Sequence, residues 1–242
     1  MPITDTVWKS EEVASKYLQG VRGAIPGALL QLEVMMRLLG TGEHTIDSFL
    51  DLGCGDGILG QTILAEHPEA QGVFVDFSEP MIDAALKRLG TDSKHAFHAI
   101  DYGQAGWIDS LSAPFDCIVS GFSIHHQPDE RKKEIYQELF DALAPGGWFI
   151  NMEHVLSATK TGETAFLQHL VDNMFALEKE SGGTRSRAEI LHAMENNEDS
   201  QANILARVDV QCEWLSAIGF QEVDCYFKIY ELAIFGGVKP TQ

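Results

Sequence analysis

Short apolar segments alternate with helical segments between residues 48 and 152, and this alternation constrains the fold more than any other feature of the chain. Repeated β–α units of this length need parallel strands joined by right-handed crossovers. We therefore predict a doubly wound α/β fold, with helices on both faces of a mostly parallel, Rossmann-like sheet. The helical patterns lie at residues 58–67, 78–89 and 128–143, and the expected strands at residues 48–52, 72–76, 96–100, 115–120 and 148–152.

The C-terminal part of the chain adds a different pattern. A helix at residues 208–218 is followed by apolar segments at residues 222–229 and 230–236. Because almost nothing separates these two segments, they are expected to pair as antiparallel strands. The predicted sheet thus has seven strands and ends in an antiparallel C-terminal hairpin.

Two stretches lie outside the β–α repeat. Residues 8–40, interrupted near Ile25–Gly27, predict an N-terminal helical cap, and residues 157–206 predict a helical insertion with a break at Gly182–Gly183. We expect one domain over residues 1–242, in which cap and insertion together form a lid over the carboxyl edge of the sheet. The insertion has one apolar helical face to bury, made of Phe166, Leu167, Leu170, Val171, Met174, Phe175 and Leu177.

The charge of the chain argues against several kinds of partner. There are 36 acidic residues against 17 lysines and arginines, a net charge of −19, whereas nucleic-acid binders usually present a basic patch. The short basic runs Lys87–Arg88 and Arg131–Lys133 are expected to be solvated helix faces. No apolar run approaches the roughly 20 residues that span a bilayer, and the N-terminal residues do not resemble a signal peptide. We expect a cytoplasmic protein without a nucleic-acid or membrane partner.

A glycine-rich turn between the first expected strand and the first helix marks a ligand site. Residues 51–57 read Asp-Leu-Gly-Cys-Gly-Asp-Gly. Glycines at alternate positions permit positive φ and let a ligand touch the backbone, and Asp51 can hold a cationic group. Asp76 ends the second strand, 21 residues after Gly55, where a carboxylate can accept hydrogen bonds from both ribose hydroxyls.

The same turn also fits a dinucleotide fingerprint, because Gly55, Gly57 and Gly60 have the required spacing. An NAD-dependent oxidoreductase is therefore an alternative. Two features oppose it: Asp51 would repel a pyrophosphate, and the chain lacks the Tyr-x-x-x-Lys pair of short-chain dehydrogenases.

Taken together, the motifs resemble those of class I S-adenosylmethionine (SAM) dependent methyltransferases. Residues 51–57 look like the family's first motif, and residues 75–78 followed by Pro80 and Met81 are similar to its second. Residues 143–147 resemble the turn before its fifth strand, and the final strand pair its C-terminal hairpin. The resemblance covers about residues 45–155 and 207–238. Bacterial small-molecule methyltransferases are similar, and carboxy-SAM synthase has a similar layout with an inserted helical segment.

The resemblance implies a set of cofactor-binding residues. Gly53, Gly55 and Gly57 would line the methionine portion, and Asp51 would face its ammonium. The remaining implied contacts are Asp76 with the ribose, Phe77 and Met81 around the adenine, Asp101 with the adenine amino group beside Tyr102, Ser120 near the methionine, and Arg22 with the carboxylate. For Phe77 and Met81 a place in the core is an alternative, as is the protein surface for Arg22.

Two adjacent histidines, His125 and His126, follow the fourth strand and are the candidate catalytic bases. A histidine has a pKa near neutral pH and can remove a proton from an acceptor. The alternative is that they pack against or cap the following helix. No metal site is expected, because a third ligand has no obvious position and the four cysteines form no CxxC pair.

The preferred function is a SAM-dependent methyltransferase for a small-molecule substrate, with S-adenosylhomocysteine (SAH) as product. A SAM-modifying enzyme similar to carboxy-SAM synthase and a SAM-binding protein without turnover are alternatives, and a homodimer is left open. Arg185, Arg187 and Arg207 are the candidate anchors for an acidic substrate.

Overall fold

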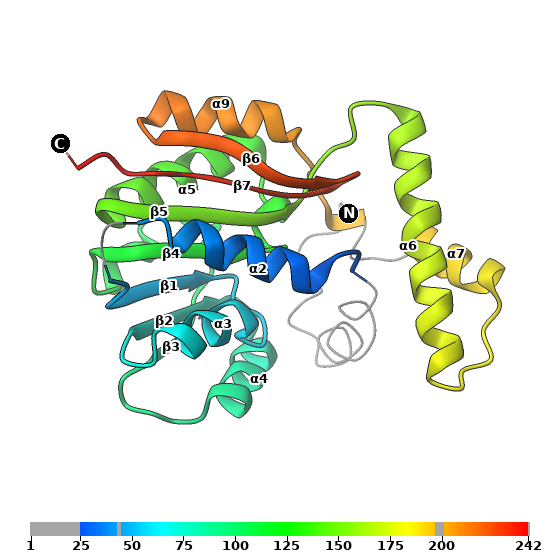
Figure 1. Ribbon diagram of the computed structural model, residues 1–242, viewed down its shortest axis with the longest axis horizontal. Coiled ribbons are helices and arrows are strands. Elements are labelled where there is room, and N and C mark those ends of the chain that lie inside the picture. The colour runs from blue at the N-terminus through cyan, green and yellow to red at the C-terminus, as the bar shows by residue number, and fades with distance from the viewer. Residues whose placement is uncertain (1–24, 43–44, 197–200, 242) are drawn as a thin grey trace.

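The structure is a computed structural model that describes residues 25–42, 45–196 and 201–241. Its centre is a seven-stranded sheet (Figure 1) made of β1 (Ser48–Leu52), β2 (Gln71–Asp76), β3 (Ala96–Ala99), β4 (Phe115–Gly121), β5 (Leu143–His154), β6 (Gln221–Ile229) and β7 (Leu232–Val238). The strand order is β3-β2-β1-β4-β5-β7-β6. β1 to β5 are parallel, and β7 lies antiparallel between β5 and β6. The predicted mixed seven-stranded sheet is confirmed.

Helices cover both faces of this sheet. One face packs against α2 (Ala28–Leu39), α3 (Ile58–Glu66) and α4 (Glu79–Leu89), and the other against α5 (Asp129–Ala142) and α9 (Val208–Ile218). Two short 3₁₀ helices, η4 (Trp107–Ser110) and η5 (Ile124–His126), interrupt the connections. α4 begins as predicted, because the Ser78 side chain accepts a hydrogen bond from the Met81 N–H.

Alternation along the strands divides the core in two. In β1, Phe49 packs with the α2–α3 side, whereas Leu50 and Leu52 pack with the α5–α9 side. In β5, Ile150 and Met152 join the first cluster and Phe149 the second. Because side chains on both faces of β1 and β5 are buried, these strands are rich in apolar residues, which explains why they could be recognised in the sequence.

The turn expected at residues 143–147 lies within β5 and not before it, as an irregular segment between the pairs Phe115–Leu143 and Cys117–Trp148, with a φ of 83° at Gly146. β5 begins at Leu143, directly after α5 ends at Ala142. The Gly146 N–H donates to the Lys239 carbonyl (2.8 Å), and the Lys239 N–H donates to the Gly147 carbonyl (2.9 Å). This pairing with the C-terminal segment, 92 residues away from Gly147, draws the glycines into the strand.

The basic run at residues 131–133 is not the solvated helix face that was expected. Lys133 is exposed, but Arg131 and Lys132 are buried. The Lys132 ammonium donates to Asp129 Oδ1 (2.7 Å) and to the Ile204 carbonyl. Burial of a charged group is tolerated here because its hydrogen bonds are made within the protein.

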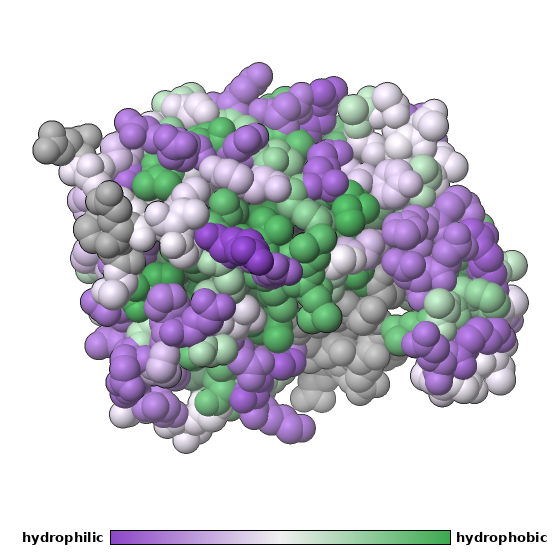
Figure 2. All heavy atoms as spheres, viewed as in Figure 1, coloured by the Kyte–Doolittle hydropathy of each residue, from purple (hydrophilic) through white to green (hydrophobic). Residues whose placement is uncertain are grey.

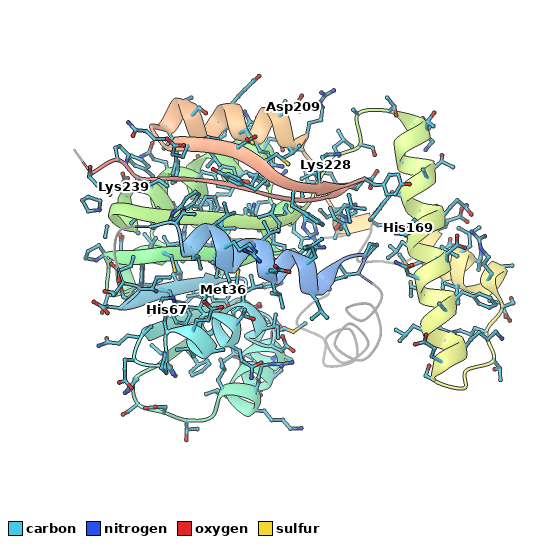
Figure 3. All side chains as sticks on the ribbon, viewed as in Figure 1. Met36, His67, His169, Asp209, Lys228 and Lys239 are labelled. Carbon is cyan, nitrogen blue, oxygen red and sulfur yellow. The ribbon has the colours of Figure 1, made fainter. Side chains whose placement is uncertain are left out.

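The insertion forms a helical hairpin of α6 (Lys160–Glu180) and α7 (Arg187–Glu195) at one end of the molecule (Figure 1). Of the seven apolar residues expected on its buried face, Phe166 and Val171 are buried and the others partly exposed. His169 of α6 lies near the β6–β7 hairpin (Figure 3), with its ring 5.8 Å from that of Tyr230. None of the helices in the described ranges is long and apolar enough to cross a membrane.

Candidate functional site

A cavity of about 250 Å³ lies at the carboxyl edge of the sheet. It extends from the end of β2 past β1 to the ends of β4 and β5, and α2 covers it. This is where open α/β sheets place their ligands. Its lining residues are Ile25, Ala28, Leu29, Gln31, Leu32, Asp51, Gly53, Cys54, Gly55, Asp56, Ile58, Leu59, Asp76, Phe77, Met81, Gly121, Phe122, Ser123, His126 and Met152.

The glycine-rich turn has the backbone that the sequence predicted. Gly53, Gly55 and Gly57 have φ values of 63°, 54° and 78°, a region that residues with side chains rarely adopt. A Cβ on Gly53 would lie 1.8 Å from Ser123 Oγ, so the turn packs directly against the loop after β4. A Cβ on Gly55 would meet no atom within 4 Å. Gly55 thus presents open backbone to the cavity.

The two predicted carboxylates both line the cavity. Asp51 is fully buried, and its Oδ2 accepts from the Gly60 N–H (2.9 Å), which ties the end of β1 to α3. Asp76 Oδ2 accepts from the Gly55 N–H (3.0 Å), and Oδ1 accepts from the Ser78 N–H (2.9 Å). Burial raises the pKa of Asp76 to about 6, although these backbone hydrogen bonds oppose the shift.

The other residues implied for the cofactor separate into two groups. Phe77 and Met81 line the cavity with Asp76. Asp101, Tyr102 and Ser120 are not among its lining residues. Asp101 is exposed and accepts from the Gly103 N–H (2.9 Å), and the Ser120 hydroxyl is buried and donates to the Leu52 carbonyl (2.8 Å). Arg22 lies outside the described residues.

Tyr102 is not a lining residue, but it contacts Ser123, which is. Its ring is buried in the core, and its hydroxyl donates to the Ser123 carbonyl (3.0 Å) and lies 2.5 Å from Ser123 Oγ. Ser123 lines the cavity and also contacts Gly53. These contacts join the loops after β1, β3 and β4 at one point.

The two histidines occupy different positions. His126 lines the cavity, whereas His125 lies behind it, with 4.1 Å between the ring centroids. His125 Nδ1 is 2.5 Å from Glu153 Oε1, and the His125 backbone N–H donates to Glu153 Oε2 (3.1 Å). The strand β5 therefore supplies a buried carboxylate that fixes η5 and the His125 imidazole.

The near-neutral pKa expected for the histidines is wrong for this structure. Burial lowers the pKa of His126 to about 3 and that of His125 well below its usual value. Burial also raises the pKa of Glu153 to about 7. Both imidazoles are therefore neutral and only weakly basic at neutral pH, and Glu153 is the group of this cluster that titrates there.

A chain of buried polar groups continues from Glu153 into the core. Asn151 Nδ2 lies 3.5 Å from Glu153 Oε2 and 3.4 Å from the Tyr136 hydroxyl. That hydroxyl donates to Gln211 Oε1 (2.6 Å) on α9. Buried polar groups are costly unless hydrogen-bonded, so this chain fixes Glu153 rigidly relative to the sheet.

The insertion contacts the histidines through its C-terminal end. The Ile204 N–H donates to the His125 carbonyl (2.9 Å), and Ala202 and Asn203 hydrogen-bond the His126 and His125 side chains. The described residues of α6 and α7 do not line the cavity. The lid formed by cap and insertion stays a prediction.

The three candidate anchors for an acidic substrate are all engaged elsewhere. Arg185 pairs with Glu178 (2.6 Å), Arg187 with Asp172 (2.6 Å) and Arg207 with Asp209 (2.5 Å). These pairs lie outside the cavity lining, so the structure does not bring these arginines to the site.

Sequence reasoning did not assign a role to several lining residues. Ser123 and Phe122 follow β4, and only the fold shows that they face the glycine-rich turn and α2. Gln31 is a buried amide in α2 and is 1% exposed. A polar residue on the apolar stripe of an amphipathic helix was the available signal for Gln31. Glu153 could be seen only as a carboxylate at the end of a strand.

Comparison with known proteins gives concordant results. Residues 50–149 match the family described as Methyltransferase domain. The biotin biosynthesis bifunctional protein BioHC of Teredinibacter turnerae is 32% identical over 119 residues, which make up 46% of this chain and 20% of that protein. A carboxy-S-adenosyl-L-methionine synthase of Nitratiruptor is 25% identical over 241 residues, 98% of this chain and 95% of that enzyme.

A solved structure extends the comparison to the fold. Phosphoethanolamine N-methyltransferase 2 of Haemonchus contortus, in complex with S-adenosyl-L-methionine, superposes with a TM-score of 0.62. The match covers 96% of this chain and 57% of that one at 17% identity. At this identity the likeness is one of fold, and it agrees with the sheet order and C-terminal hairpin described above.

Proposed function

We propose that the chain is a class I SAM-dependent methyltransferase and that it transfers the methyl group of SAM to a small-molecule acceptor bound in the cavity at the carboxyl edge of its sheet. One observation carries the proposal. A glycine-rich backbone, a ribose-accepting carboxylate and a neutral imidazole, contributed by Gly55, Asp76 and His126, line the same cavity.

The residues present fit SAM. Open space at Gly55 leaves room for a ligand against the backbone. The Asp76 carboxylate is held by two backbone N–H groups and lines the cavity, where it would accept hydrogen bonds from a ribose. Phe77 and Met81 provide apolar surface for the adenine, and Asp51 provides a negative charge for the ammonium.

Bound SAM supplies an activated methyl group on a sulfonium, and the protein has to align the acceptor and exclude water. His126 lines the cavity in its neutral form and orients the acceptor by hydrogen bonding, because a pKa lowered to about 3 makes it a weak base. His125 and Glu153 stand behind it as positioning residues, since the short Glu153–His125 contact fixes the tautomer and orientation of His125.

The lid belongs to the same proposal. α2 contributes Ala28, Leu29, Gln31 and Leu32 to the cavity wall, and Ile25 precedes them. The end of the insertion, residues 202–204, hydrogen-bonds the two histidines. Cap and insertion would therefore close over the cofactor from two sides, and SAH should slow amide exchange in residues 10–30 and 157–206.

SAM carrying a tritiated methyl group, incubated with a metabolite extract and the chain, tests the proposal. Label is expected in a small molecule, with SAH as the nucleoside product, and an Asp76→Ala variant should lower the labelling. Absence of a labelled product together with unchanged SAM would contradict methyl transfer.

The end-to-end similarity to a carboxy-S-adenosyl-L-methionine synthase supports a second candidate, an enzyme for which SAM is the substrate to be modified. Mass spectrometry of the released nucleoside separates the two. SAH indicates methyl transfer, whereas a sulfonium heavier than SAM indicates modification of SAM itself.

A further inference from the structure

We infer that the acceptor is an uncharged, largely apolar molecule, and that the wall formed by α2, the start of α3 and the loop after β4 selects against anions. The inference rests on the proposed function, because it divides the cavity between cofactor and acceptor. It names the chemical class of the acceptor, which the proposed function leaves open.

The cavity has two chemically different halves. Beneath the ends of β1 and β2 it is polar, with Asp51, Asp56 and Asp76 among its residues. The remainder of the lining is mostly apolar, although it also includes Gln31, Ser123 and His126. Its apolar members come from α2 and the turn before it, the start of α3, the loop after β4 and the end of β5, and are Ile25, Ala28, Leu29, Leu32, Ile58, Leu59, Phe122 and Met152. The aspartates of the first half can bind the polar groups of a nucleotide cofactor. The second half therefore remains for the acceptor.

Phe122 is held in this wall by its backbone. Its φ of 51° is unusual for a residue with a side chain, and its N–H donates to the Met152 carbonyl (2.8 Å). Strain of this kind persists where the surrounding structure fixes it and is concentrated at functional sites. Here the strained residue places an aromatic side chain in the lining of the cavity.

The mouth of this half is also apolar. Leu29 lines the cavity and is 83% exposed, and its neighbour Leu30 is 47% exposed. Figure 2 shows apolar side chains gathered around the start of α2. Large exposed aliphatic side chains at a cavity entrance are typical of sites for apolar ligands.

The polar residue of the α2 wall is an amide. Gln31 is 1% exposed, and its Nε2 donates to the Pro26 carbonyl (2.9 Å). A buried amide can hydrogen-bond a neutral polar substituent but cannot balance a charge. His126, on the opposite side of the cavity, is likewise neutral because burial lowers its pKa to about 3.

The negatively charged lining residues disfavour binding of an anionic acceptor. No lysine or arginine is found among the described lining residues, which include three aspartates. Arg88 is bound to the lining residue Asp56 and is itself not among the lining residues. An anionic acceptor would lose its hydration without gaining a counter-charge, in a chain with a net charge of −19.

The test compares two probes that share one bicyclic body, 2-naphthol and 2-naphthoate, titrated calorimetrically into the SAH-saturated chain at neutral pH. We expect 2-naphthol to bind at least tenfold more tightly than 2-naphthoate. Leu29→Arg places a cation at the mouth and should reduce this preference to less than threefold. The exposed position of Leu29 makes the substitution compatible with folding.

Leu30→Arg is the matched control, because it adds the same charge on the next residue, which does not line the cavity. It should keep the tenfold preference. Equal or tighter binding of 2-naphthoate by the unsubstituted chain, binding of neither probe, or equal effects of Leu29→Arg and Leu30→Arg would overturn the inference. The titration that saturates the chain with SAH tests the proposed function separately. If SAH does not bind, the proposed function is refuted, and the preference between the two probes is then measured without SAH.

Discussion

Gly53 and Gly55 adopt similar backbone conformations but have different surroundings, so alanine at each position is expected to have different consequences. Both have positive φ, which costs an L-residue about 1–2 kcal/mol. At Gly53 the new Cβ would also lie 1.8 Å from Ser123 Oγ and 2.3 Å from Ser123 Cβ. Moving Ser123 away breaks its contact with Tyr102, and overpacking of this kind costs a further 1–3 kcal/mol or so.

We therefore expect Gly53→Ala to lower the free energy of unfolding by about 2–5 kcal/mol and Gly55→Ala by about 1–2 kcal/mol. Because the Cβ of Gly55→Ala would enter open cavity space, this variant should nevertheless lose roughly tenfold or more in SAH affinity. Gly182→Ala, with φ of 76° and open surroundings far from the cavity, is the control for backbone strain alone.

Urea unfolding gives the stabilities, and calorimetry with SAH gives the affinities. Gly182→Ala should resemble Gly55→Ala in stability and the parent chain in SAH affinity. The reasoning is refuted if Gly53→Ala is no less stable than Gly55→Ala, or if Gly55→Ala binds SAH as the parent chain does.

Three further predictions concern ionisable groups. Because ribose binding needs the Asp76 carboxylate, whose pKa is about 6, SAH affinity measured by calorimetry should fall roughly tenfold per pH unit below that value, and Asp76→Asn should abolish this pH dependence. Folding raises the pKa of Glu153 from 4.5 to about 7, so its stabilising contribution is present below pH 4.5 and is lost as pH rises through 7. In urea unfolding, Glu153→Gln should therefore gain about 1–3 kcal/mol relative to the parent chain between pH 5 and pH 8, and an unchanged difference would contradict the assignment. His126→Ala should leave SAH affinity unchanged and lower label transfer about 10²-fold or more, and full transfer by this variant would make His126 structural.

The parts of the fold that local chemistry determines were predictable from the sequence. β1, β2, β4 and β5 are rich in apolar residues because both faces of the sheet are covered, and the glycine-rich turn has the positive φ values that its glycines allow. Ser78 begins α4 because its side chain accepts from the Met81 N–H. These features depend on residues close together in the chain.

The predictions that were wrong concern features that depend on contacts between residues far apart in the chain. Lys132 is buried because the carbonyl of Ile204, 72 residues away, accepts from it. β5 takes in the expected turn because Lys239 pairs with its glycines. Burial lowers the pKa of His126, and the backbone of Ala202, 76 residues further along the chain, hydrogen-bonds its side chain. The sequence around His126 does not predict that contact.

The candidate site divides in the same way. Asp51, Asp76, Phe77, Met81 and the glycines were predicted from motifs, and the structure brings them to one cavity. The resemblance also named Asp101 and Ser120, which the described cavity lining does not include. The apolar half was not predicted, because Leu29, Phe122 and Met152 come together only when α2 packs across β4 and β5.

Calorimetric titration of SAH and NAD into the full chain and into Asp76→Ala tests the central claim most directly. The account predicts that SAH binds with an affinity on the order of micromolar and that NAD does not bind. It also predicts that Asp76→Ala, by removing a charged hydrogen-bond acceptor worth about 1.5–3 kcal/mol, weakens SAH binding tenfold or more. Binding of NAD without binding of SAH, or equal SAH affinity in the two chains, would contradict the assignment of the cavity.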